Sequence, residues 1–279
     1  YVENNTDNLL GYELIIAVPD YNDGDNPVTH PLYSYFPTQI NLPVPVVCHA
    51  TFELDQSRNH LKKCKTNEFV FEKLAEFIAE VAELRAKQFP DGINAGYKIV
   101  IPLESYSHDF KSVSFEDLLY DAASNKNIIP TIDGALLSPK LSKVLNIEST
   151  EWLPEESFGD IAKCNKEQSQ FFIKLGAERL NNKELQERFI AHNWQDVDQR
   201  VKAITGIIAH NFHSSTHSSS LLLATNQKSL PHAVTVFNSR KGIDLPELPS
   251  WQKLWFLDEL MQTKLMFHLE AKDVRNLQV

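Results

Sequence analysis

The chain has 279 residues, of which 42% are hydrophobic and 23% are charged, a balance typical of one large globular domain or two smaller ones. Its net charge of -10 has the wrong sign for broad binding to a phosphate backbone, and its longest apolar runs are too short to cross a bilayer. The cysteines Cys48, Cys64 and Cys164 include no CxxC pair, which argues against a disulfide framework or a zinc knuckle. We therefore expect a protein of the reducing cytoplasm with no membrane partner, and, because it begins at Tyr1, a fragment of a longer chain.

Three short apolar runs and one long amphipathic segment predict an α/β arrangement in the first part of the chain. The expected strands are residues 12–18, 32–36 and 44–54, and the first of them is expected to be buried between Gly11 and Pro19. The prolines between the second and third strands favour a turn or an edge position.

The clearest helix is predicted over residues 67–89, where apolar side chains recur at helical spacing among glutamates and lysines. Pro90, Asp91 and Gly92 end it. The apolar positions of the strands and this helix predict the core of the first part: Leu14, Ile16, Phe52, Leu74, Phe77, Ile78 and Val81.

From about residue 97 short strands and helices alternate. A helix is expected over 115–124 with Ser114 as its N-cap, and a strand–turn–strand unit over 128–144 with its turn at Asp133-Gly134. Three helices are expected over 167–175, 183–192 and 196–212, then a second hairpin over 221–237 and a last amphipathic helix over 251–269. The two hairpins share a layout, so they are either an internal repeat or two unrelated hairpins. The expected fold class is α/β over 1–105, followed by a mixed α+β region with a helical core over 106–279.

The motifs of common enzyme classes are missing from the sequence. It contains no GxSxG, HExxH, P-loop or GxGxxG pattern. His210, His213 and His217 could share a helix face and bind zinc, but the surrounding Ser and Thr residues and the lack of an acidic partner favour an ordinary helix end. We therefore expect no bound metal.

Residues 32–86 carry a resemblance to a known family. The stretch LYSYFPTQINLPVPVVCHATFELDQSRNHL, followed by the long helix, resembles the middle, transducer region of the sacsin-like branch of the gyrase, heat-shock-chaperone, histidine-kinase and MutL (GHKL) ATPases. The resemblance covers about a fifth of the chain. Looser matches follow at Ile129-Pro130-Thr131, at Trp152-Leu153-Pro154 and over residues 249–260. The resemblance implies that the first part of the chain is a twisted sheet backed by helices.

The resemblance also implies a role for Arg58. In the ninety-kilodalton heat-shock chaperones a loop with Ser-Arg, like Ser57-Arg58 here, leads into the helix and its Arg reaches the γ-phosphate of ATP in the preceding domain. Phosphoryl transfer spreads negative charge over phosphate oxygens, which a guanidinium can stabilise. Lys62, expected one helical turn further on, is a second candidate. The alternative for Arg58 is a surface ion pair with Glu53 or Asp55.

The nucleotide site of that family has no counterpart in these residues. It requires a helix with a Glu and an Asn, and an Asp-x-Gly-x-Gly loop, whereas Asp23-Gly24-Asp25 lacks the second glycine. The resemblance thus implies that ATP and magnesium are held by a domain preceding Tyr1, and that this segment itself holds no cofactor. Its implied partners are that domain, a second copy of the chain, and a client protein or nucleic acid. The alternatives are an interaction scaffold with no nucleotide role, or a component of a bacterial phage-defence or nucleic-acid-processing system.

Overall fold

The computed structural model describes residues 2–4, 8–22, 24–194, 196–209, 236–237, 255–256 and 259–268. The described chain is a mixed α/β protein with small sheets, in agreement with the broad fold class expected from the sequence. It divides into two compact units: unit 1 is Tyr1–Asn146 with Asp160–Arg179, and unit 2 is Ile147–Gly159 with Leu180–Val279. The boundary expected near residue 105 falls inside unit 1, because the core of this unit continues through Phe110, Phe115 and Leu119.

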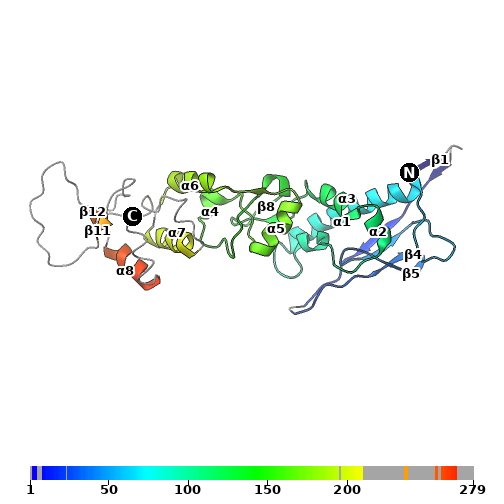
Figure 1. Cartoon of the computed structure of the whole chain (residues 1–279), viewed down its shortest axis with the longest axis horizontal. Coiled ribbons are helices and arrows are strands. Elements are labelled where there is room, and N and C mark those ends of the chain that lie inside the picture. The colour runs from blue at the N-terminus through cyan, green and yellow to red at the C-terminus, as the bar shows by residue number, and fades with distance from the viewer. Residues whose placement is uncertain are drawn as a thin grey trace, which may run out of the picture. The chain divides into compact units, whose positions relative to one another are not determined.

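Unit 1 contains a four-stranded sheet with the order β3-β6-β4-β5. Figure 1 labels two of its strands, β4 and β5. Its strands are β3 (Leu14–Ala17), β4 (Pro31–Ser34), β5 (Phe36–Asn41) and β6 (Val47–Ala50). The β3/β6 and β4/β5 pairs are antiparallel, and β4 runs parallel to β6. A separate antiparallel hairpin joins β1 (Val2–Asn4) to β2 (Asn8–Leu10).

The three expected strands are present, with two differences. The strand expected to be buried is β3, which lies at the sheet edge and leaves Ile15 55% exposed, so that prediction is wrong. The structure adds β5, which contains Pro37 and forms the opposite edge. Proline lacks an amide proton and is therefore confined to such positions, so the edge alternative for this residue is confirmed.

Helix α1 (Lys65–Gln88) packs its buried face against the core of unit 1. The bounds predicted for this helix, 67–89, agree with the structure to within two residues. The face predicted to be buried is wrong in part. Phe77 is only half-buried and Leu84 is 62% exposed, because the buried stripe runs instead through alanines. These are Ala75, Ala79, Ala82 and Ala86. Phe52, Leu74 and Ile78 are buried as expected, and Leu14, Ile16 and Val81 pack partly buried against them.

The alanines let a second segment approach α1 closely. The 3-10 helix η1 (Gly96–Val100) lies against the last turns of α1. A Cβ atom on Gly96 would lie 2.4 Å from the carbonyl oxygen of Ala82 and 2.4 Å from the amide nitrogen of Ala86. Small side chains on both segments therefore permit a backbone contact that larger ones would prevent.

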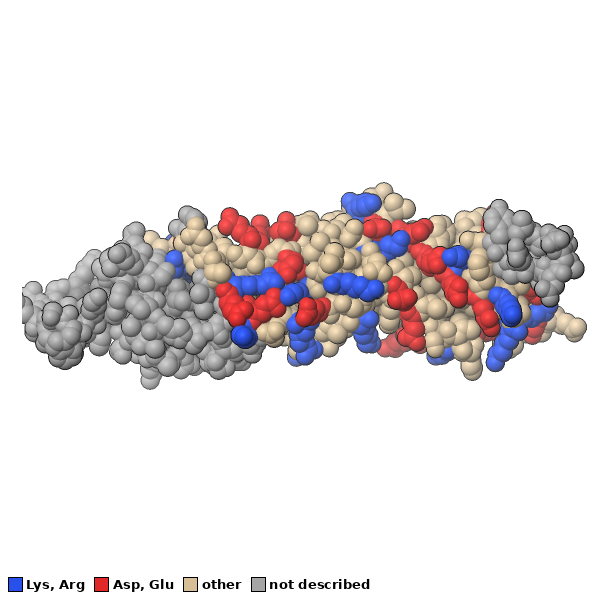
Figure 2. Space-filling model, turned by 90° about the horizontal axis from the view of Figure 1, so that it is seen from above, with Lys and Arg blue, Asp and Glu red and all other residues tan. Residues whose placement is uncertain are grey.

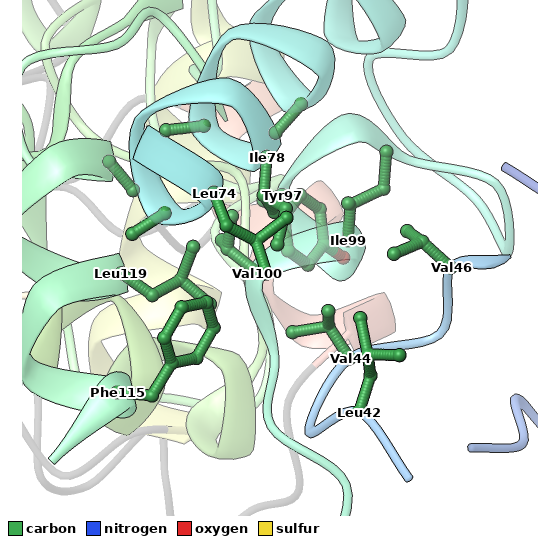
Figure 3. Close-up of a cluster of buried hydrophobic side chains, with 14 of the residues drawn as sticks. Leu42, Val44, Val46, Leu74, Ile78, Tyr97, Ile99, Val100, Phe115 and Leu119 are labelled. Atoms are coloured by element: carbon green, nitrogen blue, oxygen red, sulfur yellow. The ribbon is translucent and has the colours of Figure 1, made fainter. Parts of the chain in front are cut away.

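The core of unit 1 draws apolar side chains from four segments that are far apart in sequence (Figure 3). The β5–β6 connection contributes Leu42, Val44 and Val46, and these meet side chains of α1, η1 and α3 (Phe115–Ala123). Helix α2 (His108–Ser112) adds Phe110, which contacts Phe71 and Phe115 edge-on. Ser114 precedes α3 as predicted, but its side chain makes no capping hydrogen bond.

The rest of unit 1 follows the predicted order. The strands β7 (Ile129–Pro130) and β8 (Leu136–Leu137) pair around the Asp133-Gly134 turn, where Gly134 has a φ of 83°. Beyond the 3-10 helix η2 (Pro139–Leu141), β9 (Lys143–Val144) runs parallel to β10 (Glu178–Arg179). Helix α5 (Lys166–Lys174) matches the prediction and begins with a capping box between Asn165 and Gln168.

Unit 2 contains the helices α4 (Glu155–Phe158), α6 (Asn182–Ala191), α7 (Val197–Ala209) and α8 (Glu259–His268). The helix predicted over 251–269 is wrong at its start, because β12 (Trp255–Phe256) pairs in parallel with β11 (Val236–Phe237). Most of the hairpin predicted over 221–237, together with His210, His213 and His217, lies outside the described residues. Across the described ranges, no helix combines the length and apolar character needed to span a membrane.

Candidate functional site

Arg58 lies in a loop between β6 and α1 that is closed at its base. Leu54 and Leu61 form an antiparallel bridge, which leaves residues 55–60 as a projecting turn, here called the Arg58 loop. Arg58 is exposed, as predicted from the requirement that it reach a group outside its own domain.

The carboxylate of Asp55 organises the Arg58 loop from inside. It accepts hydrogen bonds from the hydroxyl of Ser57 at 2.7 Å and from the amide of Asn59 at 3.1 Å, and more distantly from the amide of His60. The hydrogen bond from Ser57 is the largest of the effects that lower the pKa of Asp55, and the amides of His60 and Asn59 add to it. The loop is therefore held by its own polar groups although its side chains face solvent.

A buried amide fixes the base of the same loop to α1. The side chain of Asn67 accepts a hydrogen bond from the amide of Glu53 at 2.8 Å and donates to the carbonyls of Glu53 and Lys62, each at 2.8 Å. Asp109 of α2 accepts a further 2.8 Å hydrogen bond from the amide of Leu61. Both ends of the loop are thus tied to rigid helices, which gives Arg58 a firm base.

The backbone and side chain of Arg58 are both unusual for a surface residue. Its φ of 59° lies in the left-handed region, which non-glycine residues seldom occupy. Its guanidinium donates a long 3.5 Å hydrogen bond to the carbonyl of Ser34 and stands 5.6 Å from the ring centre of Phe36. Neither Glu53 nor Asp55 forms an ion pair with this guanidinium. Glu53 pairs with Lys62, and the carboxylate of Asp55 accepts hydrogen bonds from within the loop. The guanidinium is therefore only lightly engaged.

Lys62 does not occupy the position expected for it. Because α1 begins at Lys65, residues 58–62 form no helical turn, and Lys62 lies at the base of the loop rather than one turn beyond Arg58. Its amide donates to the carbonyl of Glu53 at 3.0 Å, and its ammonium is 3.4 Å from the carboxylate of the same residue. The predicted geometry is wrong, and a phosphate-binding role for Lys62 stays a prediction.

Two aromatic side chains beside Arg58 were not anticipated as part of the site. Tyr35 is 76% exposed and Phe36 is 65% exposed, at the tight turn between β4 and β5. Tyr35 also has a left-handed backbone, with a φ of 63°, and its ring meets His49 edge-on. The sequence predicted a strand over 32–36 that contains both residues, so the turn at Tyr35 and the exposure of these rings were missed. Phe36, which the guanidinium of Arg58 contacts, and its neighbour in sequence Tyr35 are called here, together with Arg58, the Arg58 surface.

The Arg58 surface offers a fixed cation beside exposed rings, which is suited to an anionic oxygen and an apolar neighbour. Figure 2 shows acidic and basic side chains interleaved over the described face in view. Among the described residues, no group of three or more His, Cys, Asp or Glu side chains is arranged to hold a metal ion. In comparisons with protein-family models, curated proteins and solved structures, nothing matches this chain.

Proposed function

We propose that this chain is the coupling segment of a GHKL-type ATPase, in which Arg58 contacts the γ-phosphate of ATP held by another domain of the full-length protein. Binding of the nucleotide would then draw that domain onto unit 1 and change the conformation of the whole protein. The substrate of the full-length enzyme would be magnesium ATP, and the magnesium would be held outside the described residues.

The observation that carries this proposal is the state of Arg58. A structural arginine is normally engaged by carboxylates or carbonyls at short distance, whereas Arg58 makes one 3.5 Å hydrogen bond from a braced loop. A residue that must stabilise charge on a separate domain needs this combination, because a flexible arginine would lose conformational entropy on binding. The left-handed backbone of Arg58 also supports a functional role for this residue, because strained backbone conformations are found most often at functional sites.

Tyr35 and Phe36 support the same proposal as the place where the second domain would rest. Exposed aromatic rings near an arginine have the composition of an interface centre. The same rings also favour the alternative of an interaction scaffold with no nucleotide role. The two functions differ in what Arg58 does, so its substitution separates them.

The test is the rate of ATP hydrolysis by the full-length protein carrying Arg58→Ala or Arg58→Lys. We expect Arg58→Ala to lower kcat by about a hundredfold or more, because a positioned guanidinium can contribute that much to phosphoryl transfer. Arg58→Lys should recover only part of the rate, since an ammonium cannot fork onto two oxygens. Arg179→Ala, at another exposed arginine of unit 1, is the matched control and should hydrolyse ATP at the parental rate.

The stability of each variant must be measured in parallel. Loss of one exposed arginine should change the free energy of unfolding by only about 0–1 kcal/mol. If Arg58→Ala hydrolyses ATP at the parental rate, the coupling role is wrong. A parental rate for Arg58→Ala, together with loss of partner binding in Phe36→Ala, would instead establish the scaffold function.

A further inference from the structure

Strand β3 leaves one edge of the four-stranded sheet open. Among the described strands its only neighbour is β6, and β5 forms the opposite edge of the sheet. The β5 edge contains Pro37, which has no amide proton and therefore weakens pairing with a further strand. Strand β3 contains neither a proline nor a charged residue, so its edge keeps the capacity to pair.

The hydrogen bonds between β3 and β6 show which backbone groups of β3 face the open edge. The amide of Thr51 donates to the carbonyl of Glu13 at 3.2 Å. In an antiparallel pair such bonds recur at every second residue, and the register continues from Glu13 into β3 without a shift. The alternate residues Leu14 and Ile16 therefore turn their amides and carbonyls away from β6.

Apolar side chains stay exposed on both faces of this edge. Ile15 is 55% exposed on one face. On the other face a hollow of about 450 Å³ lies between the start of β3 and α1, lined in part by Tyr12, Leu14 and Phe77. Tyr12 is 39% exposed and Phe77 is half-buried. A strand added at the edge would cover these side chains and remove their apolar surface from water.

The sequence along the edge is complementary to its own reverse. When two copies run antiparallel with Ile16 opposite Ile16, Leu14 of each copy lies opposite Val18 of the other. On the outer face the large side chain of Ile15 comes opposite the small side chain of Ala17, once on each side of the twofold axis. Each apolar residue of the strand thus meets an apolar residue of the second copy.

We propose that two copies of this chain associate through the open edges of β3, antiparallel about a twofold axis at Ile16, and form one continuous sheet. This register opposes no like charges, because Glu13 of one copy comes opposite Pro19 of the other, and Tyr12 opposite Asp20. That self-complementarity is the reason to assign the edge to a second copy rather than to an unrelated strand. Nothing in the pairing depends on Arg58, so it stands apart from the function proposed above.

The first test is sedimentation velocity of the full chain. One short strand from each copy buries less surface than a stable dimer needs, so we expect a reversible dimer with a Kd of about 100 µM, visible between about 10 and about 500 µM protein. Ile15→Lys should raise that Kd at least about tenfold, because it places an ammonium against apolar side chains of the other copy twice. Leu141→Lys is the matched control, with the same charge change at a residue of η2 that is 67% exposed, and should associate like the parent.

The second test fixes the register by crosslinking. Ile15→Cys and Ala17→Cys, each in a Cys64→Ser background, are oxidised alone and as a mixture. The proposed pairing brings positions 15 and 17 of different copies to about 4.5 Å between Cα atoms, whereas 15 and 15, or 17 and 17, lie about 7–8 Å apart. Since a disulfide needs the shorter spacing, the mixture should form linked dimers at least about tenfold faster than either protein alone.

Three results would overturn the proposal: a chain that stays monomeric throughout the concentration range, an Ile15→Lys variant that associates like the parent, or equal crosslinking of the mixture and the single proteins. Circular dichroism of each variant shows whether it is folded, so that a loss of association can be assigned to the edge.

Discussion

At the scale of single residues, the Arg58 loop depends on one buried amide. Asn67 is 1% exposed and makes three hydrogen bonds, two to Glu53 and one to Lys62, which fix both ends of the loop. No other polar side chain of α1 is buried, as far as its residues are described. Asn67 lies inside the first turn of an amphipathic helix. Its position there was visible in the sequence but was not taken as a sign that it holds the loop.

Replacing Asn67 with alanine should therefore destabilise the protein. The substitution leaves the amide of Glu53 and the carbonyl of Lys62 without the partner that Asn67 provides, whereas the carbonyl of Glu53 keeps its hydrogen bond from the amide of Lys62. Each buried group that stays unsatisfied costs about 1–3 kcal/mol. Urea unfolding should show a clear loss in the free energy of unfolding. Asn59→Ala is the control in the same loop, where only the backbone amide is used, and it should stay within about 0.5 kcal/mol of the parent. Equal stabilities of the two variants would contradict this account.

Burial also separates the three cysteines. Cys48 and Cys164 are buried, and burial raises the pKa of each thiol to about 12. At pH 8 only about one molecule in ten thousand would then carry the thiolate that reacts. Cys64, just before α1, is half-buried.

We therefore expect a thiol reagent such as Ellman's reagent to titrate one cysteine of the folded protein quickly at pH 8. Cys64→Ser should remove that fast reaction, and unfolding in guanidinium should expose the remaining two thiols. A fast-reacting thiol in the Cys64→Ser protein would show that Cys48 or Cys164 is accessible, which would contradict their burial.

At the scale of elements, η1 packs on α1 with its backbone in close contact. Gly96→Ala places a methyl group 2.4 Å from backbone atoms of Ala82 and Ala86, which cannot rotate away as a side chain can. We expect a loss of about 1–3 kcal/mol or more in the free energy of unfolding, measured by urea titration. Gly11→Ala is the matched control, since no atom lies within 4 Å of the added methyl group, and it should have little effect.

The existence of α1 was predictable from its sequence, but its exact rotation was not. Apolar residues at helical spacing and the Pro90-Asp91-Gly92 stop predicted a helix over 67–89, within two residues of the observed bounds at each end. Phe77 and Leu84 are more hydrophobic than alanine, so the hydrophobic pattern predicted that these two side chains face the core. In the structure α1 instead turns alanines toward η1, because a close backbone contact requires small side chains. This contact is part of the tertiary structure, which a local sequence pattern does not contain.

The candidate site could also be predicted only in part, because its geometry depends on tertiary contacts. The exposed position of Arg58 was predicted from its resemblance to a known loop and from the requirement that it reach a group outside its own domain. The left-handed backbones of Arg58 and Tyr35 and the exposure of Phe36 depend on how β4, β5 and the Arg58 loop meet.

At the scale of the whole molecule, the described chain supplies one side of a proposed nucleotide contact. The sequence contains no Asp-x-Gly-x-Gly motif, which forms the adenine-binding loop in GHKL ATPases. Arg58 would reach only the γ-phosphate. Adenine, ribose and the other phosphates would need contacts from another part of the full-length protein.

The isolated chain should therefore neither bind nor hydrolyse ATP. A micromolar Kd requires about 8 kcal/mol of binding free energy, whereas one exposed charge pair contributes about 0–1 kcal/mol. Calorimetry with magnesium ATP should give no saturable heat with this chain, and the full-length protein is the positive control. Saturable binding at micromolar affinity would refute the prediction, and if Arg58→Ala left that binding intact, the nucleotide would have to occupy a site other than the Arg58 surface. Absence of binding by this chain, turnover by the full-length protein and loss of that turnover in its Arg58→Ala variant would together mean that the arginine contributes only when another domain has already bound the nucleotide, as the proposed coupling requires.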